Sequence, residues 1–209
     1  MAIKPSIVLG TTNRKKGLEL AELLRTLDVQ VQTLQDYPTA IDVVEDGESF
    51  ADNARLKAIQ QATHLQQWVL GEDSGICVDA LKGAPGIYSA RFAGDGATDE
   101  TNNQQLLQQL ENTPLERRTA HYTCHMTLCD PQGQVRAESE AYCRGRILFE
   151  PVGTNGFGYD PLFEIREYHH TFGQLGSAAK AALSRRARAA RALLPQLRQL
   201  IRGGQWVQP

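Results

Sequence analysis

Residues 6–27 read SIVLGTTNRKKGLELAELLRTL, and this stretch decides the class of fold. Its first five residues, Ser6 to Gly10, form a short apolar run that predicts a buried strand. The polar segment TTNRKK then leads into a helix, which is predicted by four leucines at helical spacing, Leu20, Leu23, Leu24 and Leu27. A strand, a loop and a helix in this order are typical of an α/β protein.

Further helices are predicted downstream of this opening. Ser49 followed by Asp52 resembles a capping box, and it predicts a helix that runs to about Gln66. A second helix is predicted over Thr98 to Leu110. The alanine-rich tail from Ser177 to Arg202 is also helical in pattern, with Pro195 as the expected break.

Strand signals lie between these helices. Thr119 to Asp130 alternates apolar and polar residues, and the turn PQGQ joins it to a partner strand that runs to about Ile147. The apolar segments WVL and ICV flank GEDSG, residues 71–75, which we interpret as a polar turn. No internal repeat or linker interrupts the pattern, so residues 1–209 are predicted to form one α/β domain.

Composition limits the classes of function. Hydrophobic residues make up 41% of the 209 residues, charged residues 22%, and the formal net charge is −2. This balance is that of an ordinary globular protein and does not favour nucleic acid as a partner. The four cysteines form no CxxC pair, the first ten residues do not resemble a signal peptide, and no run of 18 apolar residues occurs. We therefore expect a cytoplasmic protein with reduced thiols and no membrane span.

The charges are distributed unevenly along the chain. One acidic group suits a hard cation such as Mg²⁺ and comprises Asp42, Glu45, Asp46, Glu48 and Asp52, followed by Glu72 and Asp73. One basic group suits an anion and comprises Lys180, Arg185, Arg186, Arg188, Arg191, Arg198 and Arg202. On charge alone, a solvated basic face is the favoured explanation of the second group.

Two short segments add chemistry to this distribution. In GEDSG, Asp73 and Ser74 project from a rigid base, where a carboxylate can bind a metal or take a proton from water; a plain polar turn is the alternative. In GTNGFGYDP, residues 153–161, glycines allow close backbone approach while Phe157 or Tyr159 offers a flat ring. A heterocyclic base fits that combination, as does a glycine-rich turn with a core aromatic.

Together these segments indicate a nucleoside triphosphate, with its base at the glycine-aromatic segment, its phosphates at the basic elements and Mg²⁺ at the acids. The sequence resembles the non-canonical purine NTP pyrophosphatases, the inosine/xanthosine triphosphate pyrophosphatase family, over nearly its full length. The matching stretches are TTNRKK, EDGESFADNARLKA, EDSGICVDALKGAPGIYSARFAG, GTNGFGYDPLF, TFGQL and KAALSRR.

The resemblance implies an elongated α/β fold with a central mixed sheet and a cleft between two lobes. It also implies a homodimer, and Mg²⁺-dependent cleavage of ITP, dITP or XTP into the monophosphate and pyrophosphate. By motif, Asp73 looks like the catalytic base and a metal ligand, and Glu45 like the second metal carboxylate. The residues that resemble substrate contacts are Thr11, Thr12, Asn13, Lys16, Ser74, Phe157, Gly158, Tyr159, Asp160, Lys180, Arg185 and Arg186.

Three positions depart from the family pattern. Thr12 stands where the family usually has glycine, Arg185 where it has histidine, and Ala179 where an acidic residue commonly precedes Lys180. Arg186 is the candidate donor to the 6-oxo group that separates hypoxanthine and xanthine from adenine. Two alternatives stay open: a related pyrophosphatase that acts on modified pyrimidine triphosphates, and a non-catalytic nucleotide sensor.

Overall fold

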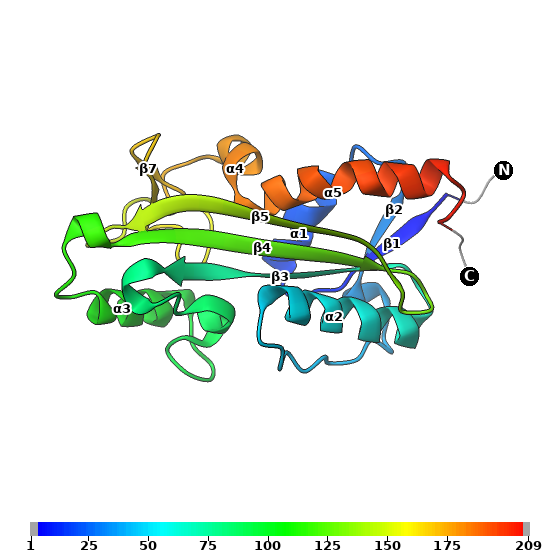
Figure 1. Cartoon of the computed structure of the whole chain (residues 1–209), viewed down its shortest axis with the longest axis horizontal. Coiled ribbons are helices and arrows are strands. Elements are labelled where there is room, and N and C mark those ends of the chain that lie inside the picture. Colours follow the sequence, from blue (N-terminus) through cyan, green and yellow to red (C-terminus); the bar gives the residue numbers. More distant parts are fainter. Residues whose placement is uncertain (1–3, 207–209) are drawn as a thin grey trace. The chain divides into compact units, whose positions relative to one another are not determined.

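A seven-stranded mixed sheet runs through this computed structural model, which describes residues 4–206 (Figure 1). The strands lie in the order β2-β1-β3-β4-β5-β6-β7. Strand β1 pairs in parallel with β2 and β3, whereas β6 pairs antiparallel with β5 and β7. Their bounds are β1 Ser6–Leu9, β2 Gln30–Thr33, β3 Val69–Val78, β4 Thr119–Cys129, β5 Val135–Ile147, β6 Phe163–Ile165 and β7 His170–Thr171. The predicted α/β fold with a mixed sheet is confirmed.

The helices largely follow the predicted segments. Their bounds are α1 Arg14–Leu24, α2 Phe50–Leu65, α3 Asp99–Gln109, α4 Ser177–Leu183 and α5 Arg185–Arg202. Helix α2 begins as predicted, because the Ser49 side chain accepts a hydrogen bond from the backbone N–H of Asp52. Thr98 caps α3 in the same way through the N–H of Thr101. Local capping chemistry therefore sets both starts.

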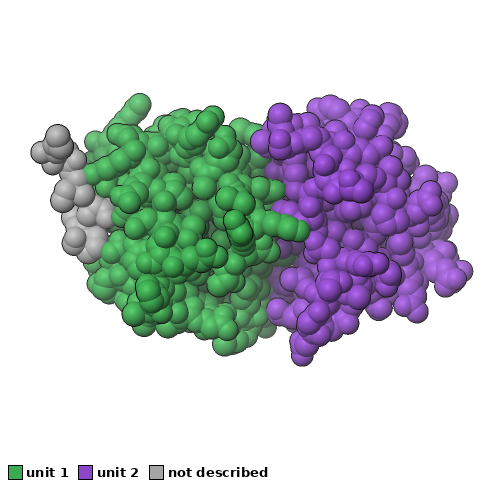
Figure 2. Space-filling view, turned by 180° about the vertical axis from the view of Figure 1, so that it is seen from behind, with its two compact units in different colours: residues 1–73, 124–141, 186–209 green, residues 74–123, 142–185 purple. Residues whose placement is uncertain are grey.

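The chain divides into two compact units that share the long strands (Figure 2). Unit 1 comprises residues 1–73, 124–141 and 186–209, and unit 2 comprises residues 74–123 and 142–185. The prediction that residues 1–209 form one domain stays a prediction, and residues 1–3 and 207–209 lie outside the described part. Within residues 4–206, no helix is both long and apolar enough to cross a membrane.

Unit 1 buries side chains on both faces of its strands. Ile7 and Leu9 of β1 pack in a cluster with residues of α1 and α5, whereas Val8 packs in another cluster with residues of α2. Successive side chains of a strand point to opposite faces, so α1 and α5 cover one face and α2 covers the other. Figure 1 shows these helices on the two sides of β1 and β3.

The interpretation of GEDSG as a turn was wrong. Residues 71–75 lie inside β3, which continues from Val69 to Val78 without interruption. Gly71 is required by packing rather than by a turn, since a Cβ there would lie 2.2 Å from the carbonyl oxygen of Ala54 in α2. The buried acids that follow it, Glu72 and Asp73, are accommodated in the strand because α1 and α5 supply cations to Glu72 and α2 supplies one to Asp73.

The expected helix break at Pro195 was also wrong. Helix α5 continues through this proline to Arg202, and the break falls at Ser184, between α4 and α5. Proline removes one backbone hydrogen bond from a helix. Here Leu193 and Leu197 on either side of it are fully buried in the core of unit 1, and their packing holds the helix together.

Candidate functional site

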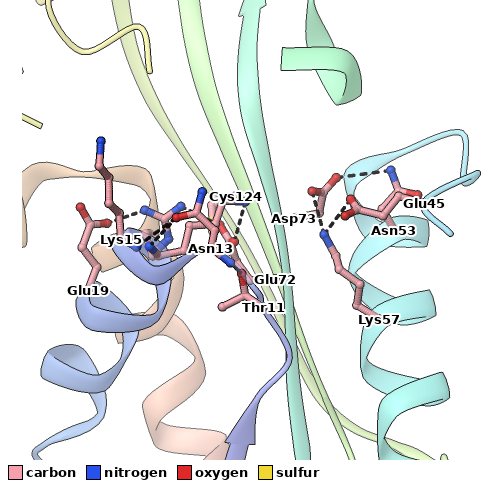
Figure 3. A network of polar contacts seen from close by, with 12 residues as sticks. Thr11, Asn13, Lys15, Glu19, Glu45, Asn53, Lys57, Glu72, Asp73 and Cys124 are labelled. Atoms are coloured by element: carbon pink, nitrogen blue, oxygen red, sulfur yellow. Dashed lines mark hydrogen bonds and ion pairs between the residues drawn. The ribbon is translucent and has the colours of Figure 1, made fainter. Parts of the chain in front are cut away.

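The two predicted metal carboxylates converge on one ammonium group in unit 1. Glu45 lies in the loop before α2, and Asp73 lies in the middle of β3. The Lys57 Nζ of α2 is 2.8 Å from Glu45 Oε2 and 3.0 Å from Asp73 Oδ1. The Asn53 amide, 3.4 Å away, donates to the other oxygen of Asp73 (Figure 3). The Glu45 and Asp73 side chains, which we call the carboxylate pair, thus face a single cation position.

Burial governs the protonation chemistry of this group. Burial raises the pKa of the Asp73 carboxyl above its ordinary value, and Lys57 and Lys16 offset part of that rise. Burial acts in the opposite sense on Lys57, but the charges of Asp73 and Glu45 outweigh it and raise the pKa of the ammonium. Lys57 therefore stays charged, whereas Asp73 holds a proton more readily than an exposed aspartate does.

A second charged group lies on the opposite face of β3. Glu72 Oε2 is 3.0 Å from Lys16 Nζ of α1, and Glu72 Oε1 is 3.0 Å from Arg186 Nη2 of α5. The other terminal nitrogen of Arg186 binds Glu19 of α1. We call Lys16, Glu72 and Arg186 the buried triad. Figure 3 shows Glu72 pointing toward α1 and Asp73 pointing toward α2.

The predicted phosphate loop forms the start of α1. The Asn13 side chain accepts hydrogen bonds from the backbone N–H groups of Lys15 and Lys16, at 3.0 and 3.2 Å, so it caps the helix. The backbone N–H of Asn13 donates to Thr11 Oγ1 at 3.2 Å, and Thr12 is exposed beside them. Unit 1 thus places these residues directly before Lys16, at an end of a helix that is positively polarised.

In unit 2, the glycine-aromatic segment folds around the Asp160 carboxylate. Asp160 is buried and accepts hydrogen bonds from the Phe157 backbone N–H at 3.0 Å, from the Tyr122 hydroxyl at 3.3 Å and from Lys180 Nζ at 2.7 Å. Gly156 has a φ of +82°, and a Cβ there would lie 2.2 Å from Asp160 Oδ2. Glycine is needed at this position because the carboxylate occupies the space of a side chain.

The aromatic residues of this segment differ in exposure. Tyr159 is 4% exposed, and its hydroxyl donates to the Ser89 carbonyl oxygen at 2.8 Å, so its ring belongs to the core of unit 2. Phe157 is half-buried, and Lys180 Nζ lies 4.5 Å from its ring centroid. Of the two rings, Phe157 is thus the one that keeps a partly open face.

Arg185, Gly158 and Ser74 are the other predicted site residues, and all three are at least partly buried. Arg185 in unit 2 is 6% exposed, and its guanidinium lies 3.8 Å from the centroid of the Tyr122 ring. Gly158 is half-buried, and its carbonyl oxygen accepts a hydrogen bond from the Asn103 amide. Ser74 follows Asp73 on β3 and is partly buried. Tyr122 therefore links Arg185 and Asp160, because its ring contacts the Arg185 guanidinium and its hydroxyl donates to Asp160.

Sequence reasoning missed Lys57 as part of the site. A signal for it exists in α2, where Asn53, Lys57 and Gln61 recur every four residues beside a stripe of buried alanines. Polar residues on a buried face need partners, so this stripe could have indicated a polar network. Glu72 belongs to the acidic group expected to suit a cation such as Mg²⁺, but its partners are Lys16 and Arg186, and nothing in the sequence indicated them. Tyr122 carried no signal, because its partner Asp160 lies far away in the sequence.

Comparison with known proteins places this arrangement in a family. The sequence model of the Ham1 family matches residues 7–196. The chain belongs to the Ham1 family. Among its relatives, the dITP/XTP pyrophosphatase of Rhodopirellula baltica is 54% identical over 93% of this chain and 94% of its own length. That of Desulforamulus reducens is 44% identical over 93% of this chain and 96% of its own length.

Solved structures of Ham1 proteins share the fold. A HAM1 protein from Coxiella burnetii is 34% identical and superposes with a TM-score of 0.86 over 93% of this chain and 99% of that chain. A nucleoside-triphosphatase, also named dITP/XTP pyrophosphatase, from Mycobacterium abscessus is 39% identical with a TM-score of 0.75 over 91% of this chain and 99% of that chain. The fold and the family thus agree with the resemblance found in the sequence.

Proposed function

We propose that this protein is a dITP/XTP pyrophosphatase, which hydrolyses dITP, ITP and XTP to the nucleoside monophosphate and pyrophosphate. The observation that carries the proposal is the carboxylate pair, which faces one cation position in a chain that is 54% identical to a dITP/XTP pyrophosphatase. Two carboxylates around a cation are what metal-assisted phosphoryl chemistry requires.

The carboxylate pair fits Mg²⁺. This ion is bound in proteins by one or two carboxylates, with substrate phosphates and water as its other ligands. Glu45 and Asp73 converge on one cation position, so these two residues would supply its carboxylates. When bound there, Mg²⁺ would neutralise phosphate charge and lower the pKa of a water molecule.

Asp73 is the proposed proton acceptor. A general base works best when its pKa lies near the working pH, and burial raises the pKa of Asp73 toward that range. In the proposed reaction its carboxylate takes the proton of the water that attacks the α-phosphorus. Asn53 and Lys57 bind separate oxygens of Asp73 and fix its orientation.

Lys16 and Arg186 of the buried triad, together with the loop before α1, are the proposed contacts for the triphosphate. Lys16 and Arg186 carry positive charge that would stabilise the departing pyrophosphate, and Ser74 lies beside the proton acceptor on β3. Thr11, Thr12 and Asn13 lie at the start of α1, where backbone dipoles favour an anion.

The base is the proposed ligand of unit 2. Phe157 offers the partly open ring, Gly158 and Tyr159 offer backbone groups, and Asp160 holds the segment together. Lys180 and Arg185 supply cations next to it. We further propose the family's two-lobed form and a homodimer.

The proposal is tested by measuring pyrophosphate release from ITP, XTP, GTP and ATP, with and without Mg²⁺. Release from ITP and XTP only with Mg²⁺ supports it, and Asp73→Asn and Glu45→Gln should each abolish release while the fold is kept. Asp28→Asn, at an exposed ion pair with Lys4, is the matched control. Binding of ITP without release would indicate a sensor, and release only from modified pyrimidine triphosphates would indicate the related pyrophosphatase.

A further inference from the structure

Glu72 is a carboxylate with no access to solvent and with two cations as partners. Its side chain is 0% exposed, whereas the side chain of Arg186 is 1% exposed and that of Lys16 is 17% exposed. The Cys124 thiol of β4 also donates to Glu72 Oε1, at 3.4 Å. Three other elements, α1, α5 and β4, thus meet at one buried acid of β3.

Stability alone does not account for this arrangement. Burying an ion pair costs as much desolvation energy as its attraction returns, so apolar side chains would fill the same space at least as well. Arg186 nevertheless keeps its charge, because Glu72, Cys124 and Glu19 together outweigh the effect of burial and raise its pKa. We therefore look for a functional role for the charges of Glu72 and Arg186.

We propose that Glu72 is a positioning residue, which holds the Lys16 ammonium and the Arg186 guanidinium in place for the anionic part of the substrate. This inference rests on the proposed function for the identity of that substrate. It assigns to Glu72 no contact with the reacting atoms, since the Glu72 side chain is 0% exposed.

The geometry of Lys16 explains how the positioning works. Its backbone N–H is bound by the Asn13 side chain at 3.2 Å, and its Nζ by Glu72 at 3.0 Å, so both ends of a flexible side chain are fixed. An ammonium group has three N–H donors, and one of them is sufficient for Glu72. The remaining N–H donors of Lys16 then already have a fixed direction before the substrate binds. This lowers the entropic cost of binding a phosphate.

The position of Glu72 on β3 separates its role from that of Asp73. Adjacent residues of a strand face opposite sides of the sheet, so the Glu72 side chain lies on the other face of β3 from the network that surrounds Asp73. Loss of the Glu72 charge should therefore weaken binding of the anion and leave the proton acceptor in place. KM for ITP should rise, and kcat should fall as well, because Lys16 also stabilises the departing pyrophosphate in the proposed reaction.

The test compares Glu72→Gln with Glu138→Gln, a matched change at another strand carboxylate that is paired with Arg55. The probe is inorganic pyrophosphate, titrated calorimetrically in EDTA, together with kcat and KM for ITP in Mg²⁺. Loss of one charge-assisted contact should raise the Kd for pyrophosphate about tenfold. Glu138→Gln should leave it unchanged. Unchanged or tighter binding in Glu72→Gln would overturn the inference.

A double-mutant cycle tests whether Glu72 acts through Lys16. If it does, Glu72→Gln should weaken pyrophosphate binding much less in a Lys16→Gln background than in the wild type, and fully additive effects would contradict this. If Glu72→Gln does not fold, as judged by its thermal melt, Glu72→Asp keeps the charge but shortens the reach and should give the same weakening. A wild type that releases no pyrophosphate from any NTP would refute the proposed function and leave this binding comparison intact.

Discussion

Replacing Lys57 by methionine is expected to destabilise the metal-free protein by about 3 kcal/mol. Removing one partner of a buried ion pair costs about 3–5 kcal/mol, because the other charge is left without compensation. The Asp73 side chain is 8% exposed, so its pair with Lys57 lies in this range. The Glu45 side chain is 37% exposed, so its pair adds at most about 1 kcal/mol. The raised pKa of Asp73 lets it bind a proton instead, which places the total at the lower end.

Thermal unfolding followed by circular dichroism in EDTA measures this loss. For a chain of this length, about 3 kcal/mol corresponds to a fall in Tm of about 6–12 °C. Saturating MgCl₂ should recover more of the Tm in Lys57→Met than it adds to the wild type. The reason is that an ion binding the carboxylate pair must displace the ammonium in the wild type but not in the variant.

Arg55→Met is the matched control in the same helix. Arg55 binds Glu138 at 2.7 and 2.8 Å, but its side chain is 44% exposed, so the variant should lose only about 0.5–1 kcal/mol. Its response to MgCl₂ should equal that of the wild type. Equal Mg²⁺ increments in Lys57→Met and in the wild type would refute the reasoning that Lys57 and the metal compete for Glu45 and Asp73.

Three further predictions follow from single residues. Gly156→Ala should lower the free energy of unfolding in urea by about 2–4 kcal/mol, because the added Cβ meets the Asp160 carboxylate. Gly158→Ala, where no atom lies within 4 Å of an added Cβ, should lower it by only about 1 kcal/mol. Hydrogen bonds from Arg55 lower the pKa of Glu138 to about 2. The ionised Glu138 should therefore stabilise the fold by about 1 kcal/mol, after solvent screening, above about pH 4.5, and this contribution should be lost as the pH falls toward 2. Thermal melts of Glu138→Gln at several pH values that keep this dependence would contradict the assignment. Arg185→His should make ITP turnover decline as the pH rises through about 6.5, where histidine loses its charge, and a pH profile identical to that of the wild type would show that the charge of Arg185 is not used.

Local chemistry explains how much of the fold could be predicted from the sequence. Helix α2 starts at Ser49 because of a hydrogen bond within three residues, and β4 alternates apolar and polar residues along its length, although nearly all of them are buried. The two errors have the opposite origin. Residues 71–75 contain the glycines and acids of a turn, but α2 packs closely against Gly71 and the segment continues as part of β3. At Pro195, packing of the flanking leucines outweighs the lost hydrogen bond.

The candidate site shows a similar division. The acids and bases that resemble functional residues could be named from motifs, because their spacing along the chain is retained. Their partners could not be named, since the pairs of Lys57 with Asp73 and of Arg186 with Glu72 join segments 16 and 114 residues apart. Such pairs form only when the fold places β3 between α2 on one face of the sheet and α1 and α5 on the other.

Strand geometry also couples the two charged groups on β3. The period of two places Glu72 and Asp73 on opposite faces, so the buried triad and the carboxylate pair cannot share a hydrogen bond through these side chains. They still interact through their charges, because Lys16 lowers the pKa of Asp73 and Glu72 raises that of Lys57. In the proposed reaction, a phosphate bound to Lys16 would neutralise part of the charge that lowers the pKa of Asp73. We therefore expect substrate binding on one face of the strand to make the proposed proton acceptor on the other face more basic.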